Sequence, residues 1–110
     1  MLRQYLEYLG VEVDEIISIG GGSKSKLWRQ IKADITGKKV VTLKNKETGC
    51  LGTAIYAGFG IGLYRDINEA VKKIVTTDSE TYPIAEKEKA DSVYNRYLAY
   101  DKLLLNRENL

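Results

Sequence analysis

Residues 18–28, SIGGGSKSKLW, place three consecutive glycines between two segments of different periodicity. Before the glycines, Glu15–Ile19 is a short β-branched run, which is typical of a strand buried on both faces. After them, apolar residues recur at helical spacing, namely Leu27, Trp28, Ile31 and Ile35. We therefore expect a strand, a glycine turn and a helix, with Ser23 as the N-cap of the helix and Gly37 as its stop.

The glycine turn has two interpretations. Unpaired backbone N–H groups at a helix N-terminus bind anions, and glycine lets a ligand approach the backbone, but a plain strand–helix turn also uses glycines. The turn is not a Walker A loop, because no glycine stands in register before Lys24 or Lys26, and the dinucleotide fingerprint would need a glycine at Ser25. The two lysines crowd the first helical turn, where each cation costs about 0.3–1 kcal/mol. An anionic ligand would offset that cost, and so would screening by solvent.

The rest of the chain alternates helices, one further strand and polar connections. Lys38–Leu43 is expected to be a second strand, parallel to the first and joined to it by a right-handed crossover. Two strands make a poor sheet, and the first helix starts almost at Met1 without a capping residue. We therefore expect a fragment of a larger domain, or a subunit that a partner completes. The other expected elements are helices at Leu2–Leu9, Cys50–Tyr64, Arg65–Val75 with Asp66 as N-cap, and Glu86–Asn109, and a polar loop at Thr76–Pro83.

Composition excludes several classes of function. The 110 residues suit one small domain, and 17 Lys and Arg against 15 Asp and Glu give a net charge of +2, which gives no reason to expect nucleic-acid or membrane binding. The chain has no histidine, so Ser–His and Cys–His catalysis are excluded. The single cysteine, Cys50, permits no internal disulfide and fits a reduced, cytoplasmic setting. The longest uncharged run, residues 48–64, is too short and too rich in glycine to span a membrane.

Two motifs in order resemble the C-terminal domain of the FGGY carbohydrate kinases. The first is Gly20-Gly21-Gly22-Ser23-Lys24-Ser25, followed by Trp28, Gln30 and Ala33-Asp34. The second is Glu47 with Cys50-Leu51-Gly52-Thr53-Ala54, which is similar to the family's Glu followed by Ala-Leu-Gly-Ala-Ala. Within the family, the chain is most similar to the xylulose kinases. The resemblance covers nearly the whole chain.

The resemblance implies an α/β fold: part of an actin-like, ribonuclease-H-like ATPase domain, helix-rich, with a short parallel strand pair. Residues 1–110 would be the C-terminal part of the nucleotide-binding domain of a kinase that transfers the γ-phosphoryl of ATP to a pentulose, D-xylulose, with Mg²⁺ arriving through the nucleotide. Gly20, Gly21, Gly22 and Lys24 would line the adenosine and phosphate side of the ATP site, and Ser25 would lie near the adenine.

The resemblance also implies what this chain lacks. The family's catalytic aspartate, its sugar-binding residues and its phosphate loops all lie upstream of these motifs. We therefore assign no catalytic residue and no metal ligand, and we expect the chain alone to be inactive as a kinase. The competing hypothesis is a non-catalytic interaction module, or a split-kinase subunit completed by a separate N-terminal half or by a dimer partner.

Several residues outside the glycine turn have a functional and a structural interpretation. Glu47 is either a polar contact near the nucleotide or, more simply, a carboxylate at a helix start. Trp28 is either a stacking surface for adenine or, as we favour, a core residue, and Cys50 is expected to be a small core residue. Asp34 is expected to hold the end of its helix. We expect another part of the domain, or a dimer partner, to pack on the aromatic side of the last helix, which carries Tyr94, Tyr97 and Tyr100.

Overall fold

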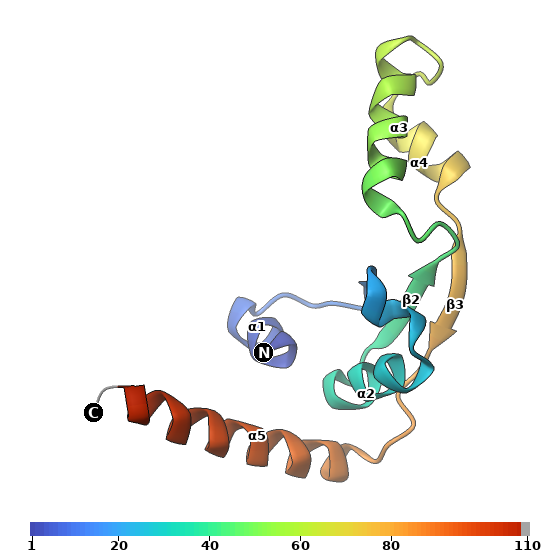
Figure 1. Cartoon of the computed structure of the whole chain (residues 1–110). Coiled ribbons are helices and arrows are strands. Elements are labelled where there is room, and N and C mark those ends of the chain that lie inside the picture. Colours follow the sequence, from blue (N-terminus) through green and yellow to red (C-terminus); the bar gives the residue numbers. More distant parts are fainter. Residues whose placement is uncertain (109–110) are drawn as a thin grey trace.

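A three-stranded mixed sheet joins the parts of the molecule, in a computed structural model that describes residues 1–108, with side chains through residue 105 (Figure 1). Strand β1 (Glu15–Ser18) runs parallel to β2 (Lys39–Leu43), with Ile16 opposite Val40. The predicted parallel pair is therefore confirmed. The other edge of β2 pairs antiparallel with β3, Thr77–Thr81, so that the strand order is β1-β2-β3.

Strand β3 lies where the sequence predicted a polar loop, and that prediction is wrong. Polar side chains of β3 find partners across the strands: the hydroxyl oxygens of Thr42 and Ser79 are 2.7 Å apart, and Lys39 Nζ lies 3.1 Å from Glu80 Oε1. Cross-strand pairs of this kind stabilise a strand that has no apolar side chain of its own. A strand that reads as Thr-Asp-Ser-Glu-Thr therefore holds its place by hydrogen bonds and charge rather than by hydrophobic burial.

The helices follow the predicted periodicity with small changes of boundary. The helix predicted to run to Tyr64 ends at Gly60, and the chain then turns at Gly62, whose φ is +76°. Asp66 is the N-cap of the following helix as predicted, because its Oδ1 accepts a hydrogen bond from Glu69 N at 2.9 Å. The predicted last residue of the final helix, Asn109, lies outside the described residues. The helices are α1 (Leu2–Leu9), α2 (Lys26–Thr36), α3 (Thr48–Gly60), α4 (Ile67–Ile74) and α5 (Lys87–Glu108).

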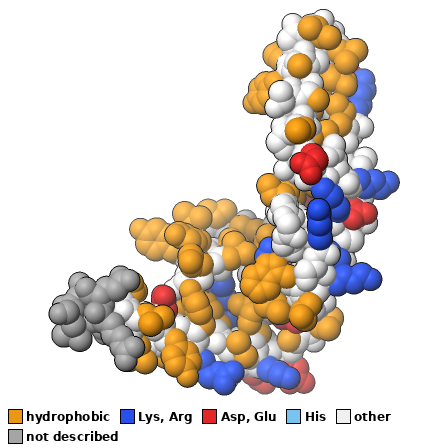
Figure 2. Space-filling view, viewed as in Figure 1, with side chains coloured by type: hydrophobic (Ala, Val, Ile, Leu, Met, Phe, Trp, Pro, Cys, Tyr) orange, Lys and Arg blue, Asp and Glu red, His pale blue; other side chains and the backbone are white. Residues whose placement is uncertain are grey.

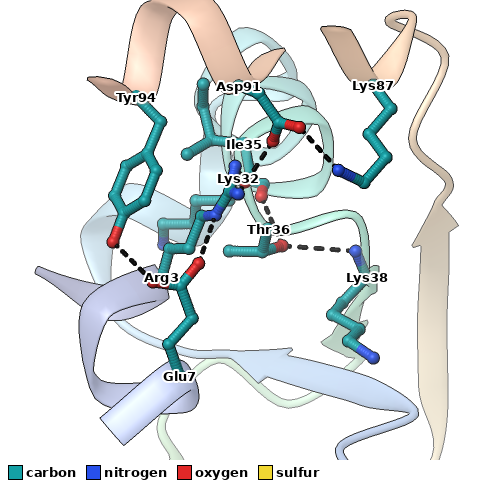
Figure 3. Close-up of polar contacts among 9 residues, drawn as sticks. All are labelled: Arg3, Glu7, Lys32, Ile35, Thr36, Lys38, Lys87, Asp91 and Tyr94. Carbon is teal, nitrogen blue, oxygen red and sulfur yellow. Dashed lines mark hydrogen bonds and ion pairs between the residues drawn. The ribbon is translucent and has the colours of Figure 1, made fainter. Parts of the chain in front are cut away.

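Arg3 joins three helices at one end of the molecule (Figure 3). Its guanidinium forms ion pairs with Glu7 at 2.9 Å and Asp91 at 2.8 Å, and donates to the carbonyl oxygen of Ile35 at 3.2 Å. It also lies 4.1 Å from the centre of the Tyr94 ring, whose hydroxyl donates to Glu7 at 3.0 Å. Tyr94 is thus covered by helix α1 of the same chain, whereas the sequence had suggested a partner or another part of the domain.

Asp34 ties α2 to the segment that leads into α5. Its Oδ1 accepts hydrogen bonds from the backbone N–H groups of Ile84 at 2.8 Å and Ala85 at 3.2 Å, and from Gln30 Nε2 at 3.0 Å. Burial alone would raise the pKa of Asp34, but these three donors outweigh it and hold the pKa below its ordinary value. Gln30 also donates to the carbonyl oxygen of Tyr82 at 2.9 Å. These contacts give Asp34 the structural role expected from the sequence.

The buried core of the described residues is small. Ile17 and Ile19 are 55% and 56% exposed and Cys50 is exposed, so the predictions that β1 is buried on both faces and that Cys50 is a core residue are wrong. One face of β1 is left open: Glu15 and Ile17 are exposed, whereas Ile16 and Ser18, which alternate with them, are at least partly buried. The buried apolar residues are Ala33, Val40, Val41, Ile55, Ala70, Ala90 and Tyr94.

Two arms leave this core, the α3–α4 pair and the length of α5 (Figure 1). The radius of gyration is 18.1 Å, against about 13 Å for a compact domain of this length. Apolar side chains gather over both arms (Figure 2), and Ile61 is 82% exposed and Tyr100 67% exposed. Among the described residues, no helix combines the length and the apolar character needed to cross a membrane.

Candidate functional site

The glycine turn lies at the carboxyl ends of the parallel strands, beside the loop that follows β2. This edge is where open α/β sheets hold their ligands, because both strands end there next to a helix N-terminus. A narrow hollow lies between the turn and the loop, and it has no room for a water molecule. A nucleotide would therefore lie over it rather than inside it. The hollow is lined by Ser18, Ile19, Gly20, Ser23, Leu43, Asn45, Lys46 and Thr48.

The turn has a defined shape that begins at Gly20. Its φ of 77° and ψ of −170° lie in a region that is open essentially to glycine alone. The 3₁₀ helix η1 (Gly21–Lys24) follows, and Ser23 closes it by donating to the carbonyl oxygen of Gly20 from its N at 3.1 Å and from its Oγ at 2.7 Å. Ser23 is 2% exposed, so its hydroxyl bonds within the turn and does not face solvent.

Ser25, and not Ser23, is the N-cap of α2. Its Oγ accepts a hydrogen bond from Trp28 N at 3.2 Å. The prediction for Ser23 is wrong because the 3₁₀ turn delays the start of α2 by two residues and uses the Ser23 hydroxyl internally. The Ser25 hydroxyl keeps its hydrogen, so this side chain can still donate to a ligand.

The remaining members of the predicted site lie on the outside of the turn. A Cβ built on Gly21 would meet nothing within 4 Å, whereas one on Gly22 would come within 3.1 Å of Trp28 Cδ1. Lys24 is exposed at the end of η1, and within the described part of the chain its side chain makes no hydrogen bond or ion pair. The structure thus places all five predicted residues, Gly20, Gly21, Gly22, Lys24 and Ser25, on one continuous turn.

Trp28 is not the core residue that the sequence favoured. It is 49% exposed, and Leu27 and Ile31 on the same helical face are 71% and 41% exposed. The described elements leave the side of α2 that carries Leu27 and Trp28 exposed, and the indole lies on the surface beside Gly22. Lys32 Nζ lies 5.9 Å from the centre of the Trp28 ring and donates to Ser18 Oγ at 3.1 Å, which links α2 to the end of β1.

The sequence did not single out the cationic groups behind the turn. Arg29 donates from Nη1 to the carbonyl oxygen of Ser23 at 2.6 Å. Lys46, in the loop after β2, donates to the carbonyl oxygen of Leu43 at 2.7 Å and pairs with Asp78 Oδ2 at 2.8 Å. That hydrogen bond from Lys46 is the main reason that the pKa of Asp78 is lowered, and the charge of Arg29 adds to it. The position of the loop after a second parallel strand was the signal that would have found Lys46.

The second motif lies at the start of α3. Glu47 occupies the N-cap position without a capping hydrogen bond from its side chain, and Cys50 lies exposed in the first turn. No group of three or more His, Cys, Asp or Glu within the described residues is arranged to hold a metal ion. Mg²⁺ in phosphoryl-transfer sites is commonly held through one or two carboxylates and the phosphates of the nucleotide.

The fold and the match to a family model point to the same class of protein. The helix-rich architecture, with its small mixed sheet and a parallel strand pair ending in a glycine turn, is that of an actin-like ATPase domain. Residues 1–61 match the profile of the FGGY family of carbohydrate kinases, C-terminal domain. The match covers more than half of the 110 residues, and the chain belongs to this family.

Known proteins similar to this chain are kinases with different names. The autoinducer-2 kinase of Salmonella paratyphi B is 44% identical over 85 residues, which are 77% of this chain and 16% of the relative. The xylulose kinase structure from Rhodospirillum rubrum is 26% identical, with a TM-score of 0.74 over 96% of this chain and 22% of that one. The Plasmodium falciparum glycerol kinase structure with ADP, 21% identical, shares the fold with a TM-score of 0.77 over 92% of this chain and 21% of its own. This chain thus spans about one sixth of the length of the curated relatives that it matches.

Proposed function

We propose that residues 1–110 are the C-terminal part of the nucleotide-binding domain of an FGGY kinase, and that Gly20–Ser25 forms the adenosine and phosphate wall of its ATP site. The whole enzyme transfers the γ-phosphoryl group of ATP to a hydroxyl of a pentulose, with D-xylulose as the candidate sugar. Because ATP is the donor, a cytoplasmic location is part of the proposal.

The shape of the glycine turn carries this proposal. Gly20 has a backbone conformation that side chains disfavour, and Gly21 leaves open space where a Cβ would stand. A ligand can therefore approach the backbone closely. The exposed ammonium of Lys24 and the positive end of α2 both favour an anion at this point. ATP and ADP combine the flat adenosine and the anionic phosphates that such a wall would receive.

The proposal divides the reaction between this chain and the rest of the enzyme. Phosphoryl transfer needs a positioned acceptor hydroxyl, a base and neutralisation of the phosphate charge from several sides. The residues assigned here supply only one side of the nucleotide site, so we expect no kinase activity from this chain alone. The relatives are named for different acceptors, and D-xylulose rests on the xylulose kinase resemblance. Assaying the longer enzyme with a panel of sugars and polyols tests that choice.

Titration of the ¹⁵N-labelled chain with ADP, followed by amide NMR, tests the nucleotide site. We expect shifts at Gly20–Ser25 at millimolar ADP, and weaker binding in Lys24→Met. The matched control is Lys102→Met on α5, which removes an exposed lysine far from the turn along the chain. If no amide of the turn shifts in this chain, the site is not preformed here; if ADP also leaves the turn of the longer enzyme unchanged, the assignment is wrong.

A non-catalytic interaction module is the second candidate, and the exposed apolar surface favours it. Leu103, Leu104 and Ile61 are each more than 60% exposed, and apolar patches of such extent on a small chain mark contact surfaces. In this case the chain is a split-kinase subunit that a separate N-terminal half completes. Size-exclusion chromatography with light scattering tests the idea. A monodisperse monomer with no tendency to associate would count against it.

A further inference from the structure

Arg29 reaches back from the first turn of α2 to the glycine turn. Its Nη1 donates to the carbonyl oxygen of Ser23 at 2.6 Å, and Ser23 in turn donates twice to the carbonyl oxygen of Gly20. These bonds form one chain from the guanidinium to the residue with the constrained backbone. The turn is therefore fixed at both ends, at Ser23 by Arg29 and at Gly20 by Ser23.

Most N–H donors of Arg29 have no hydrogen-bond partner among the described residues. A guanidinium carries five N–H donors, and the contact with Ser23 is the hydrogen bond that the described residues give to this side chain. Its Nε is buried and has no hydrogen-bond partner within the described residues. The charge of Arg29 helps to lower the pKa of Asp78, but Asp78 forms its ion pair with Lys46. Within the described residues, the charge of Arg29 is thus not neutralised by an ion pair with a carboxylate.

A structural role alone explains this arrangement poorly. A neutral donor would satisfy the carbonyl oxygen of the buried Ser23 as well, whereas a partly buried guanidinium with an unpaired Nε costs desolvation energy. An anionic ligand bound at the turn would offset part of this desolvation energy, because the charge of Arg29 would attract it. Arg29 contacts the turn at the Ser23 carbonyl, whereas a Cβ on Gly21 would meet nothing within 4 Å.

We propose that Arg29 is a positioning residue of the nucleotide site: it holds the Gly20–Lys24 turn in its binding shape through the Ser23 carbonyl, and its charge favours a phosphorylated nucleoside over the nucleoside alone. This inference rests on the proposed function. It assigns to Arg29 two separable effects, one on the shape of the turn and one on the charge that the turn presents.

Two substitutions separate the effects. Arg29→Met removes both the hydrogen bond and the charge. Arg29→Lys keeps the charge and one donor but loses the planar fork. We expect Arg29→Met to weaken ADP binding about tenfold, the loss typical of one hydrogen bond from a charged group, and to weaken adenosine binding less. Arg29→Lys recovers most of the preference for ADP over adenosine. Arg96→Met, at an exposed site on α5, is the control and leaves both affinities unchanged.

Hydrogen exchange supplies a readout that needs no ligand. The Ser23 amide is bonded to the Gly20 carbonyl, and we expect its exchange to become faster in Arg29→Met but not in Arg96→Met. Unchanged Ser23 protection in Arg29→Met overturns the positioning role, and so does faster exchange with unchanged ADP affinity. If the wild-type turn ignores ADP even in the longer enzyme, the proposed function fails by itself, and the exchange result still decides whether Arg29 holds the turn.

Discussion

Trp28 lies directly against Gly22, so close that a Cβ on this glycine would stand 3.1 Å from Trp28 Cδ1 and 3.3 Å from Nε1. The indole of α2 thus packs on the backbone of the turn that precedes the helix. The glycine at position 22 serves this contact rather than an unusual φ, since its φ is not positive. The contact with Trp28 therefore accounts for the glycine at position 22 of the motif.

Substituting Gly22→Ala should displace the indole. The added methyl group needs a few tenths of an ångström, and the half-exposed ring can move outward to give it. Trp28 is the one tryptophan of the chain, so its fluorescence reports the change without interference. We expect a red shift of the emission maximum in Gly22→Ala, and none in Gly21→Ala, where a Cβ meets nothing. Identical emission in all three proteins would contradict the packing of Trp28 on the turn.

The first two glycines should respond differently to alanine. Gly20 has a φ of 77° and a ψ of −170°, a conformation that costs a non-glycine residue of order 1–3 kcal/mol. Gly21 has no positive φ and open space around it. We expect Gly20→Ala to lower the free energy of unfolding by about 1–3 kcal/mol, and Gly21→Ala to leave it nearly unchanged. Urea unfolding followed by circular dichroism measures both, and equal losses would show that the turn is not fixed as described.

The sequence predicted the helices and the parallel pair because their signals are local. Gly37 ends α2 with a φ of 66° as expected, and Asp66 caps α4. Strand β3 was missed because its stability comes from partners on β2, which lie about 40 positions away along the chain. The candidate site residues of the turn were predicted from the glycines. Arg29 was not among them, because its hydrogen bond is to a backbone carbonyl, which no sequence pattern marks.

Exposure was the feature that the sequence predicted least well. Helical and strand periodicity indicates which side chains share a face, but not whether another element covers that face. Trp28 and Ile17 both lie on apolar faces, and both are about half exposed among the described residues. The prediction that they are buried assumed that another element packs on these faces, and among the described residues none does so completely.

The hydroxyl pair between Thr42 and Ser79 should couple β2 to β3. The two oxygens are 2.7 Å apart and Thr42 is 1% exposed, so removing one partner leaves a buried hydroxyl with its bond unmade. We expect Thr42→Val and Ser79→Ala each to destabilise the chain by about 1 kcal/mol or more. The double variant should lose less than the sum of the two. Strict additivity in this double-mutant cycle would mean that the pair contributes nothing to the register of β3.

Asp34 should make the stability of the chain depend on acid pH. Its carboxylate accepts two backbone N–H groups and the Gln30 amide, and its folded pKa is therefore lower than its unfolded pKa of about 3.9. A lowered folded pKa means that the folded state binds the proton more weakly than the unfolded state does. The contribution of Asp34 is thus fully present above the unfolded pKa, and it is lost as the pH falls through the folded pKa.

Comparing Asp34→Asn with wild type over this range isolates the effect, because other carboxylates titrate equally in both proteins. Asparagine keeps an acceptor oxygen but not the charge, so we expect it to lower the free energy of unfolding by about 1 kcal/mol near neutral pH. The difference from wild type should shrink as the pH falls below about 4. Asp14→Asn is the control, since Asp14 is exposed and forms no hydrogen bond or ion pair with the described residues. Its curve should run parallel to wild type. A difference for Asp34→Asn that stays constant from neutral to acid pH would show that the contacts of Asp34 do not depend on its charge.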